Sequence, residues 1–139
     1  MKRKTQKILR SAKLRCTGPR KIILGALMDA GRPQTAEQIA AKLGPACPDK
    51  VTIYRTLESF VEAGFVHRAF INERSQHFEM ADHCSSKQCH PHFVCNGCGK
   101  TQCLIGQRIV SVKAPRGGFV VQRQQVRLEG LCPSCSELR

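Results

Sequence analysis

Cys95-Asn96-Gly97-Cys98 and Cys132-Pro133-Ser134-Cys135 are two C-x-x-C pairs in the second half of a chain of 139 residues. Together they supply four thiolates, the ligand set of a closed tetrahedral structural zinc site. A single pair would also fit a redox motif, whereas a second pair of similar form favours a metal. The pattern therefore predicts that zinc holds the C-terminal half together.

Disulfide bonds or a buried apolar cluster could also use several cysteines, but both fit the composition poorly. Disulfides are typical of secreted proteins, and Met1-Lys2-Arg3-Lys4 is not followed by the apolar run of a signal peptide. No stretch approaches the ~20 apolar residues of a membrane-spanning helix. The chain has no Trp, one Tyr and six Phe, too few aromatic residues for an aromatic-rich core. We therefore expect a cytoplasmic protein with no membrane partner, whose nine cysteines are metal ligands and free thiols.

Positive charge is concentrated near the N-terminus. Residues 1–21 contain nine Lys and Arg side chains and no Asp or Glu, within a formal net charge of +13 for the chain. Taken alone, such a run is often only a solvated or disordered tail. Here it leads directly into a helix-turn-helix pattern, which favours binding to nucleic acid.

Three helix patterns and a hairpin pattern follow the basic segment. Capping and apolar spacing predict helices that start near Gly18, Thr35 and Asp49 and end near Gly31, Gly44 and Gly64. Residues 65–71 and 76–80 then read as two strands around a polar turn. Three helices and a hairpin make a winged helix-turn-helix domain, in which the third helix enters the major groove of DNA.

The remainder of the chain predicts a small α/β unit. Phe93-Val94 and residues 119–128 are strand-like, and residues 104–112 suggest a short helix cut off by Pro115 and Gly117-Gly118. The expected fold class is α+β, with a winged-helix domain over residues 1–81 and a zinc-stapled domain over residues 82–139.

Several motifs resemble the ferric uptake regulator family of metal-sensing repressors. They are Val51-Thr52-Ile53-Tyr54-Arg55-Thr56-Leu57, Ala63-Gly64-Phe65-Val66, the run from His90 to Lys100, and the final cysteine pair, in the order in which the family has them. The match spans roughly residues 10–137. The resemblance implies a homodimer, joined through the C-terminal domain, that binds a palindromic, AT-rich DNA operator when a regulatory metal is bound. It implies no enzymatic activity and no small-molecule substrate.

The resemblance also suggests a regulatory metal site. His67 and Cys84 match ligands of the zinc uptake regulator branch, and we expect them to join His90 and His92; Cys103 is a fifth candidate for a site that needs four ligands. Imidazole and thiolate donors favour zinc over iron. The histidine that iron and peroxide sensors place near Pro33-Gln34 is missing. Glu79 matches an acidic ligand of the iron sensors, so an iron- or peroxide-sensing regulator stays open as an alternative.

DNA contacts are assigned by the same resemblance. Thr52, Tyr54 and Arg55 would face the major groove, with Tyr54 against thymine methyl groups. Lys13, Arg15 and Arg20 would reach the backbone and an AT-rich minor groove.

Two other classes of protein remain as alternatives. A zinc-ribbon protein that binds nucleic acid or serves as a scaffold would use both cysteine pairs, but it leaves His67, Cys84 and the His90-x-His92 pair unexplained. A thiol oxidoreductase would need a thioredoxin-like βαβ unit around its cysteine pair, and a zinc hydrolase would need an open metal position and a general base; the chain has no H-E-x-x-H motif.

Overall fold

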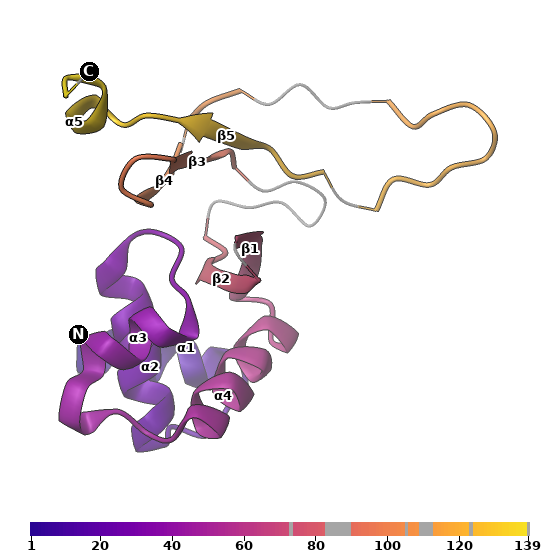
Figure 1. Cartoon of the computed structure of the whole chain (residues 1–139). Coiled ribbons are helices and arrows are strands. Elements are labelled where there is room, and N and C mark those ends of the chain that lie inside the picture. The colour runs from indigo at the N-terminus through magenta and orange to yellow at the C-terminus, as the bar shows by residue number, and fades with distance from the viewer. Residues whose placement is uncertain (73, 83–89, 105, 109–112, 123, 139) are drawn as a thin grey trace. The chain divides into compact units, whose positions relative to one another are not determined.

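The computed structural model describes residues 1–139 except 73, 83–89, 105, 109–112, 123 and 139 (Figure 1). The chain divides into two compact units, unit 1 from Met1 to Asp82 and unit 2 from His83 to Arg139. None of the described helices is long and apolar enough to cross a membrane.

Unit 1 has the element order of a winged helix, preceded by one additional helix. Its elements are α1 (Lys2–Ser11), α2 (Gly18–Ala30), α3 (Ala36–Leu43), the 3-10 turn η1 (Gly44–Ala46), α4 (Lys50–Glu62), β1 (Val66–Asn72) and β2 (Ser75–Met80). Helix α1 was not expected from the sequence, where residues 1–21 read only as a basic segment. Its buried face is small, with Leu9 and Thr5 turned inward while the basic side chains cover the rest, so the apolar signal was weak.

Capping residues confirm three of the predicted helix ends. Thr35 and Gln38 form a reciprocal capping box at the start of α3, and the Asp49 carboxylate accepts the Thr52 backbone N–H at the start of α4. Gly31 ends α2 with φ of 59°, a left-handed conformation that glycine adopts without steric cost. The Asp49 cap fixes where α4 begins and therefore which of its side chains face outward.

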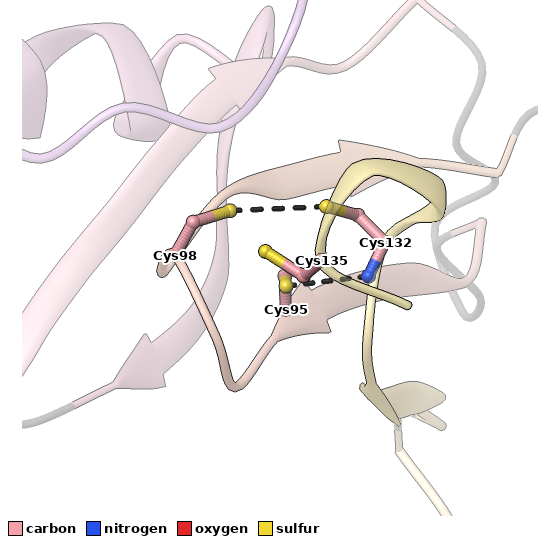
Figure 2. Close-up of side chains that lie close together, drawn as sticks. All are labelled: Cys95, Cys98, Cys132 and Cys135. Atoms are coloured by element: carbon pink, nitrogen blue, oxygen red, sulfur yellow. Dashed lines mark hydrogen bonds between the residues drawn. The ribbon is translucent and has the colours of Figure 1, made fainter. Parts of the chain in front are cut away.

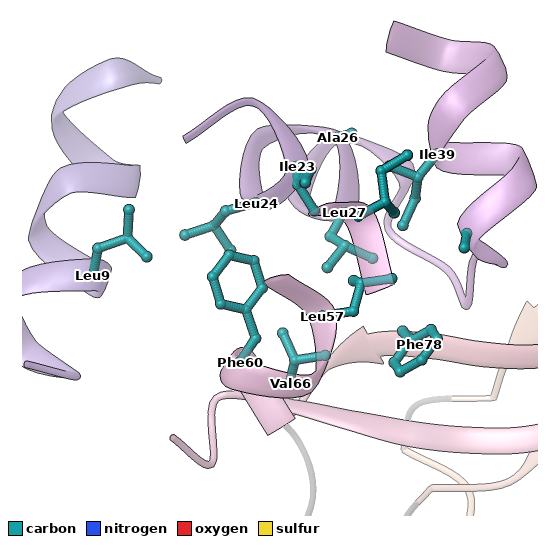
Figure 3. Close-up of a cluster of buried hydrophobic side chains, with 12 residues drawn as sticks. Leu9, Ile23, Leu24, Ala26, Leu27, Ile39, Leu57, Phe60, Val66 and Phe78 are labelled. Atoms are coloured by element: carbon teal, nitrogen blue, oxygen red, sulfur yellow. The ribbon is translucent and has the colours of Figure 1, made fainter. Parts of the chain in front are cut away.

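Helices α1 to α4 and the hairpin all contribute to one hydrophobic core (Figure 3). Phe60 of α4 and Phe78 of β2 are fully buried in it, and the Phe60 ring packs at 4.9 Å from that of Phe65. The core consists of Leu9, Ile23, Leu24, Ala26, Leu27, Ala36, Ile39, Ile53, Leu57, Phe60, Val66 and Phe78. Because Ile53, Leu57 and Phe60 anchor one face of α4, the opposite face is held towards solvent.

The hairpin carries a contact that the sequence did not predict. Strands β1 and β2 are antiparallel, with His67 opposite Glu79, and Gln34 adds a bridge to Phe78 on the other side of β2. The backbone of Gln34 and Phe78 exchanges two hydrogen bonds of 2.8 Å. The segment before α3 is therefore hydrogen-bonded to the β1–β2 hairpin, which is the wing of the winged-helix domain.

Unit 2 is built on a three-stranded sheet in the order β4-β3-β5. Strand β3 (His92–Cys95) pairs antiparallel with β4 (Thr101–Cys103) and parallel with β5 (Arg127–Gly130), and a short helix α5 (Pro133–Ser136) follows. The first cysteine pair therefore lies at the end of β3 (Cys95) and in the loop that leads to β4 (Cys98), and the end of β5 leads into the second pair.

The strand expected over residues 119–128 was placed too early. Among the described residues, strand β5 begins at Arg127, because its parallel partner β3 offers only four residues for pairing. Phe119 and Val120 are exposed instead, at 66% and 83%. Most of the helix expected over residues 104–112 falls outside the described residues.

Candidate metal centres and nucleic-acid interface

The four cysteines of the two C-x-x-C pairs converge in unit 2 (Figure 2). The Sγ atoms of Cys95, Cys98, Cys132 and Cys135 all lie within 4.8 Å of one another. The Cys98 and Cys132 sulfurs are 3.9 Å apart, and the Cys132 backbone N–H donates to Cys95 Sγ at 3.3 Å. Four thiols at this spacing, one from the end of β3, one from the β3–β4 loop and two from the segment after β5, fit a structural zinc site.

Local electrostatics divide these thiols into two kinds. Hydrogen bonds from backbone N–H groups, first that of Cys132 and then that of Cys98, lower the pKa of the Cys95 thiol to about 6. Hydrogen bonds to the neighbouring thiols, first that of Cys132, raise the pKa of the Cys135 thiol to about 12. One thiolate therefore forms readily while a second beside it does not. A divalent cation removes this conflict, because it compensates the charge of several thiolates at once.

A second group of metal donors lies in unit 2, at the end of the β3–β4 pair opposite to Cys95. His90, His92 and Cys103 each offer a nitrogen or sulfur atom, and these atoms lie within 4.8 Å of one another. His92 is directly opposite Cys103 in the β3–β4 pairing, and its ring centroid is 4.6 Å from that of His90. His92 is only 3% exposed. Two imidazoles and one thiol thus converge in a partly buried position.

The other two expected ligands of the regulatory site are not in this group. His67 lies on β1 of unit 1, where its Nε2 is 2.7 Å from Glu79 Oε1 on the opposite strand. Both side chains are well buried, at 12% and 5% exposure. Cys84 falls outside the described residues. The structure therefore brings together three of the five candidate ligands, and Cys103 is one of the three.

The outward face of α4 carries the side chains expected to contact DNA. Tyr54 and Arg55 are exposed and Thr52 is partly buried. The Thr52 hydroxyl donates to Asp49 Oδ2 at 2.6 Å, and the Tyr54 hydroxyl donates to Glu37 Oε1 of α3 at 3.2 Å. The outward face of α4 is thus supported by a carboxylate of α3 and by the N-cap carboxylate of α4 itself.

The basic residues expected at the DNA backbone surround the junction between α1 and α2. Lys13 and Arg15 are exposed in the connecting segment, and Lys13 has a φ of 57°. Arg20, in the first turn of α2, donates through Nη1 to the Arg15 carbonyl at 3.2 Å. This contact links two of the three residues and holds the connection against α2.

Comparison with known proteins identifies the family. A model of the ferric uptake regulator family matches residues 11–128 of the chain. The chain belongs to the ferric uptake regulator family. It is 29% identical over 140 residues to a ferric uptake regulation protein of Campylobacter upsaliensis, covering 96% of this chain and 87% of that protein.

Solved structures support the same assignment. The Vibrio cholerae ferric uptake regulator has a TM-score of 0.65 and 26% identity, covering 91% of this chain and 98% of that chain. A zinc uptake regulator complexed with zinc and DNA has a TM-score of 0.66 at 20% identity, covering 98% and 93%, and shows likeness of fold. The α+β fold with a winged-helix domain is thereby confirmed.

Membership in the ferric uptake regulator family establishes the class of function. The protein is a metal-responsive transcriptional regulator that binds DNA, and the family's regulators are dimeric and are not enzymes. A zinc-ribbon scaffold without sensing is therefore set aside. The matching relatives include proteins named for ferric uptake and for response to peroxide, so the family alone does not fix the metal, and the choice depends on this chain's own donors.

Two features of these sites could not be read from the sequence. Cys103 gains its position from the β3–β4 register, which no local motif encodes. Glu37 has the place of an ordinary first-turn residue of its helix, yet its carboxylate reaches the recognition helix. The Gln34 amide donates to the Pro33 carbonyl at 2.9 Å.

The cysteine cluster predicts that Gly97→Ala weakens metal binding at this site. A Cβ at position 97 would lie 2.9 Å from Cys135 Sγ and 3.1 Å from Cys135 Cβ, so the cysteine would have to move. Changes beside metal ligands typically weaken binding by roughly 10–100-fold, and we expect a loss in that range. Competition with a chromophoric zinc chelator measures it.

Gly130→Ala is the matched control in the same unit. Its Cβ would meet the Phe93 ring at 3.5 Å, an ordinary van der Waals contact. Neither Gly97 nor Gly130 has a positive φ, so alanine strains the backbone at neither position. Equal zinc retention by the two variants would contradict the assignment of the four thiols as a metal site.

Proposed function

We propose that the protein is a zinc-responsive repressor in the cytoplasm, whose metal-loaded dimer binds a palindromic, AT-rich operator. The observation that carries the proposal is the donor set of His90, His92 and Cys103. Two imidazoles and a thiolate suit zinc, whereas iron(II) and manganese(II) sites in proteins are richer in oxygen donors. The four-cysteine cluster serves a different purpose, as a structural zinc site filled whether or not the regulatory site is.

The fourth regulatory ligand is proposed to come from the DNA-binding unit. Closed tetrahedral zinc needs one donor beyond the three in unit 2, and His67 supplies it. Glu79 then has the role of hydrogen-bond partner, because ligating histidines commonly bond a carboxylate through their other ring nitrogen. A metal that binds both units limits their relative motion. It favours DNA binding to the extent that it binds the DNA-competent arrangement more tightly than other arrangements.

The second candidate function is iron or peroxide sensing, and the buried Glu79 carboxylate favours it. The Glu79 side chain is only 5% exposed, so its carboxylate has little access to water and is itself a possible metal ligand. In that arrangement, His67 would be the residue that orients Glu79. Cys84 remains a further candidate ligand by resemblance alone.

The zinc proposal predicts metal selectivity in DNA binding. The protein is first stripped of metal and then reloaded with zinc at the structural site alone. The probe is the DNA duplex that the zinc-loaded protein enriches from a random library. Zinc should restore binding to this duplex at a far lower free concentration than iron(II) or manganese(II). Cys103→Ser should raise the zinc concentration needed by at least roughly tenfold, because a thiolate ligand is lost. Fluorescence anisotropy of the labelled duplex gives both values.

Cys47→Ser is the matched control, since Cys47 lies in unit 1, where its Sγ donates to the Pro48 carbonyl. It should respond to zinc as the wild type does. Activation by iron(II) at the same concentration as zinc, together with a normal response from Cys103→Ser, would favour the second candidate.

The roles of His67 and Glu79 predict different outcomes for two neutral substitutions. If His67 is the ligand, His67→Gln should abolish zinc-dependent binding while the four-cysteine zinc is retained. Glu79→Gln should only weaken zinc affinity, by roughly 10–100-fold, as is typical when the hydrogen-bond partner of a metal ligand is changed. Zinc analysis and anisotropy of both variants test this. The reverse order of severity would identify Glu79 as the ligand and would overturn the assignment of His67.

A further inference from the structure

Two hydroxyl groups in the first turns of α4, those of Thr52 and Tyr54, donate their protons to carboxylates of the protein. Tyr54 donates to Glu37 at 3.2 Å and Thr52 donates to Asp49 at 2.6 Å. An ionised carboxylate can only accept hydrogen bonds, so each hydroxyl must be the donor in its pair. What remains available to a ligand at each hydroxyl is an oxygen that accepts.

Both carboxylates are held in the ionised state. The Glu37 backbone N–H, followed by the Tyr54 hydroxyl and the Lys50 charge, lowers the pKa of Glu37. Hydrogen bonds from the side chain and then the backbone of Thr52 lower the pKa of Asp49. Partial burial, and next the bond to Glu37, raise the pKa of Tyr54. At neutral pH the phenol therefore keeps its proton and Glu37 keeps its charge.

Lys50 completes the arrangement around Glu37. Its Nζ is 3.8 Å from Glu37 Oε1 and 6.0 Å from the centroid of the Tyr54 ring. The ammonium offsets the negative charge that Glu37 would otherwise present to DNA. The carboxylate can thus stay beside the recognition face without strongly repelling phosphates.

We infer that Glu37 is a positioning residue that sets base preference, because it takes the Tyr54 hydroxyl proton and leaves the recognition helix with an acceptor and an apolar ring. This inference rests on the proposal that Tyr54 faces the major groove. An acceptor beside an apolar surface matches the adenine amino group and the thymine methyl of one A·T pair. In a G·C pair, guanine presents the acceptor O6 where adenine presents its amino group, and cytosine has no methyl, so an oxygen that can only accept is disfavoured at that position.

Glu37→Ala tests the inference, with base preference as the measured quantity. The probe is the duplex that the zinc-loaded wild type enriches from a random library, compared with duplexes in which single A·T pairs are changed to G·C. Once its proton is released from Glu37, the Tyr54 hydroxyl can donate to guanine. The preference for A·T at the contacted pair should then fall by roughly fivefold, the worth of one ordinary hydrogen bond.

Two further variants distinguish the effect of the Glu37 hydrogen bond to Tyr54 from the effect of removing a negative charge. Glu37→Gln keeps an amide oxygen that can accept the phenolic proton, and it should retain most of the preference. Glu62→Ala removes the same charge from the exposed C-terminal residue of α4. It should change affinity for all duplexes by a similar factor and leave the preference intact.

A spectroscopic measurement follows the contact itself. Tyr54 is the only tyrosine of the chain, so protein labelled with ¹³C at tyrosine Cζ gives one resonance. Glu37→Ala should move this resonance towards its position in the unfolded protein, and Glu62→Ala should not.

The outcomes distinguish the inference from the function on which it rests. An unchanged A·T preference in Glu37→Ala, with Tyr54→Ala still weakening binding to the enriched duplex, overturns the role of Glu37 alone. Unchanged binding by Tyr54→Ala places the recognition face elsewhere and overturns both.

Discussion

The crowding of four thiols is the constraint on which the C-terminal unit depends. With all Sγ atoms within 4.8 Å of one another, the thiolates cannot ionise together unless a cation compensates them. Little else holds this unit: among its described residues, the buried apolar side chains are Pro91, Val94 and Cys95. Metal binding at such a site contributes directly to folding. The same sheet that joins the cysteine pairs also aligns His92 with Cys103, so the proposed structural site would support the proposed regulatory donors.

The N-terminal unit is stabilised in a different way. Its hydrophobic core, with Phe60 and Phe78 fully buried, needs no metal, and it fixes α4 so that Tyr54 and Arg55 face outward. The wing contributes the buried pair of His67 and Glu79. In the proposed mechanism, the N-terminal unit keeps its fold while a metal ion controls how the two DNA-binding units of a dimer are presented.

Features with a local cause could be predicted from the sequence, and those set by strand pairing could not. The capping box at Thr35 and the cap at Asp49 placed two helices correctly, since each depends on residues within one turn. The last strand was placed too early because its length is limited by β3, a partner distant in sequence. The convergence of Cys103 with the two histidines, and the reach of Glu37 to Tyr54, likewise depend on tertiary pairing.

The central claim is that bound metal, rather than apolar packing, folds the C-terminal unit, while the N-terminal unit folds on its own core. Amide hydrogen exchange of the full chain, followed by mass spectrometry before and after complete metal removal under reducing conditions, tests it directly. The account predicts that protection in β3 and β5 is lost on metal removal while α2 and α4 keep theirs. Retained protection of β3 and β5 in protein shown to be free of metal would contradict it.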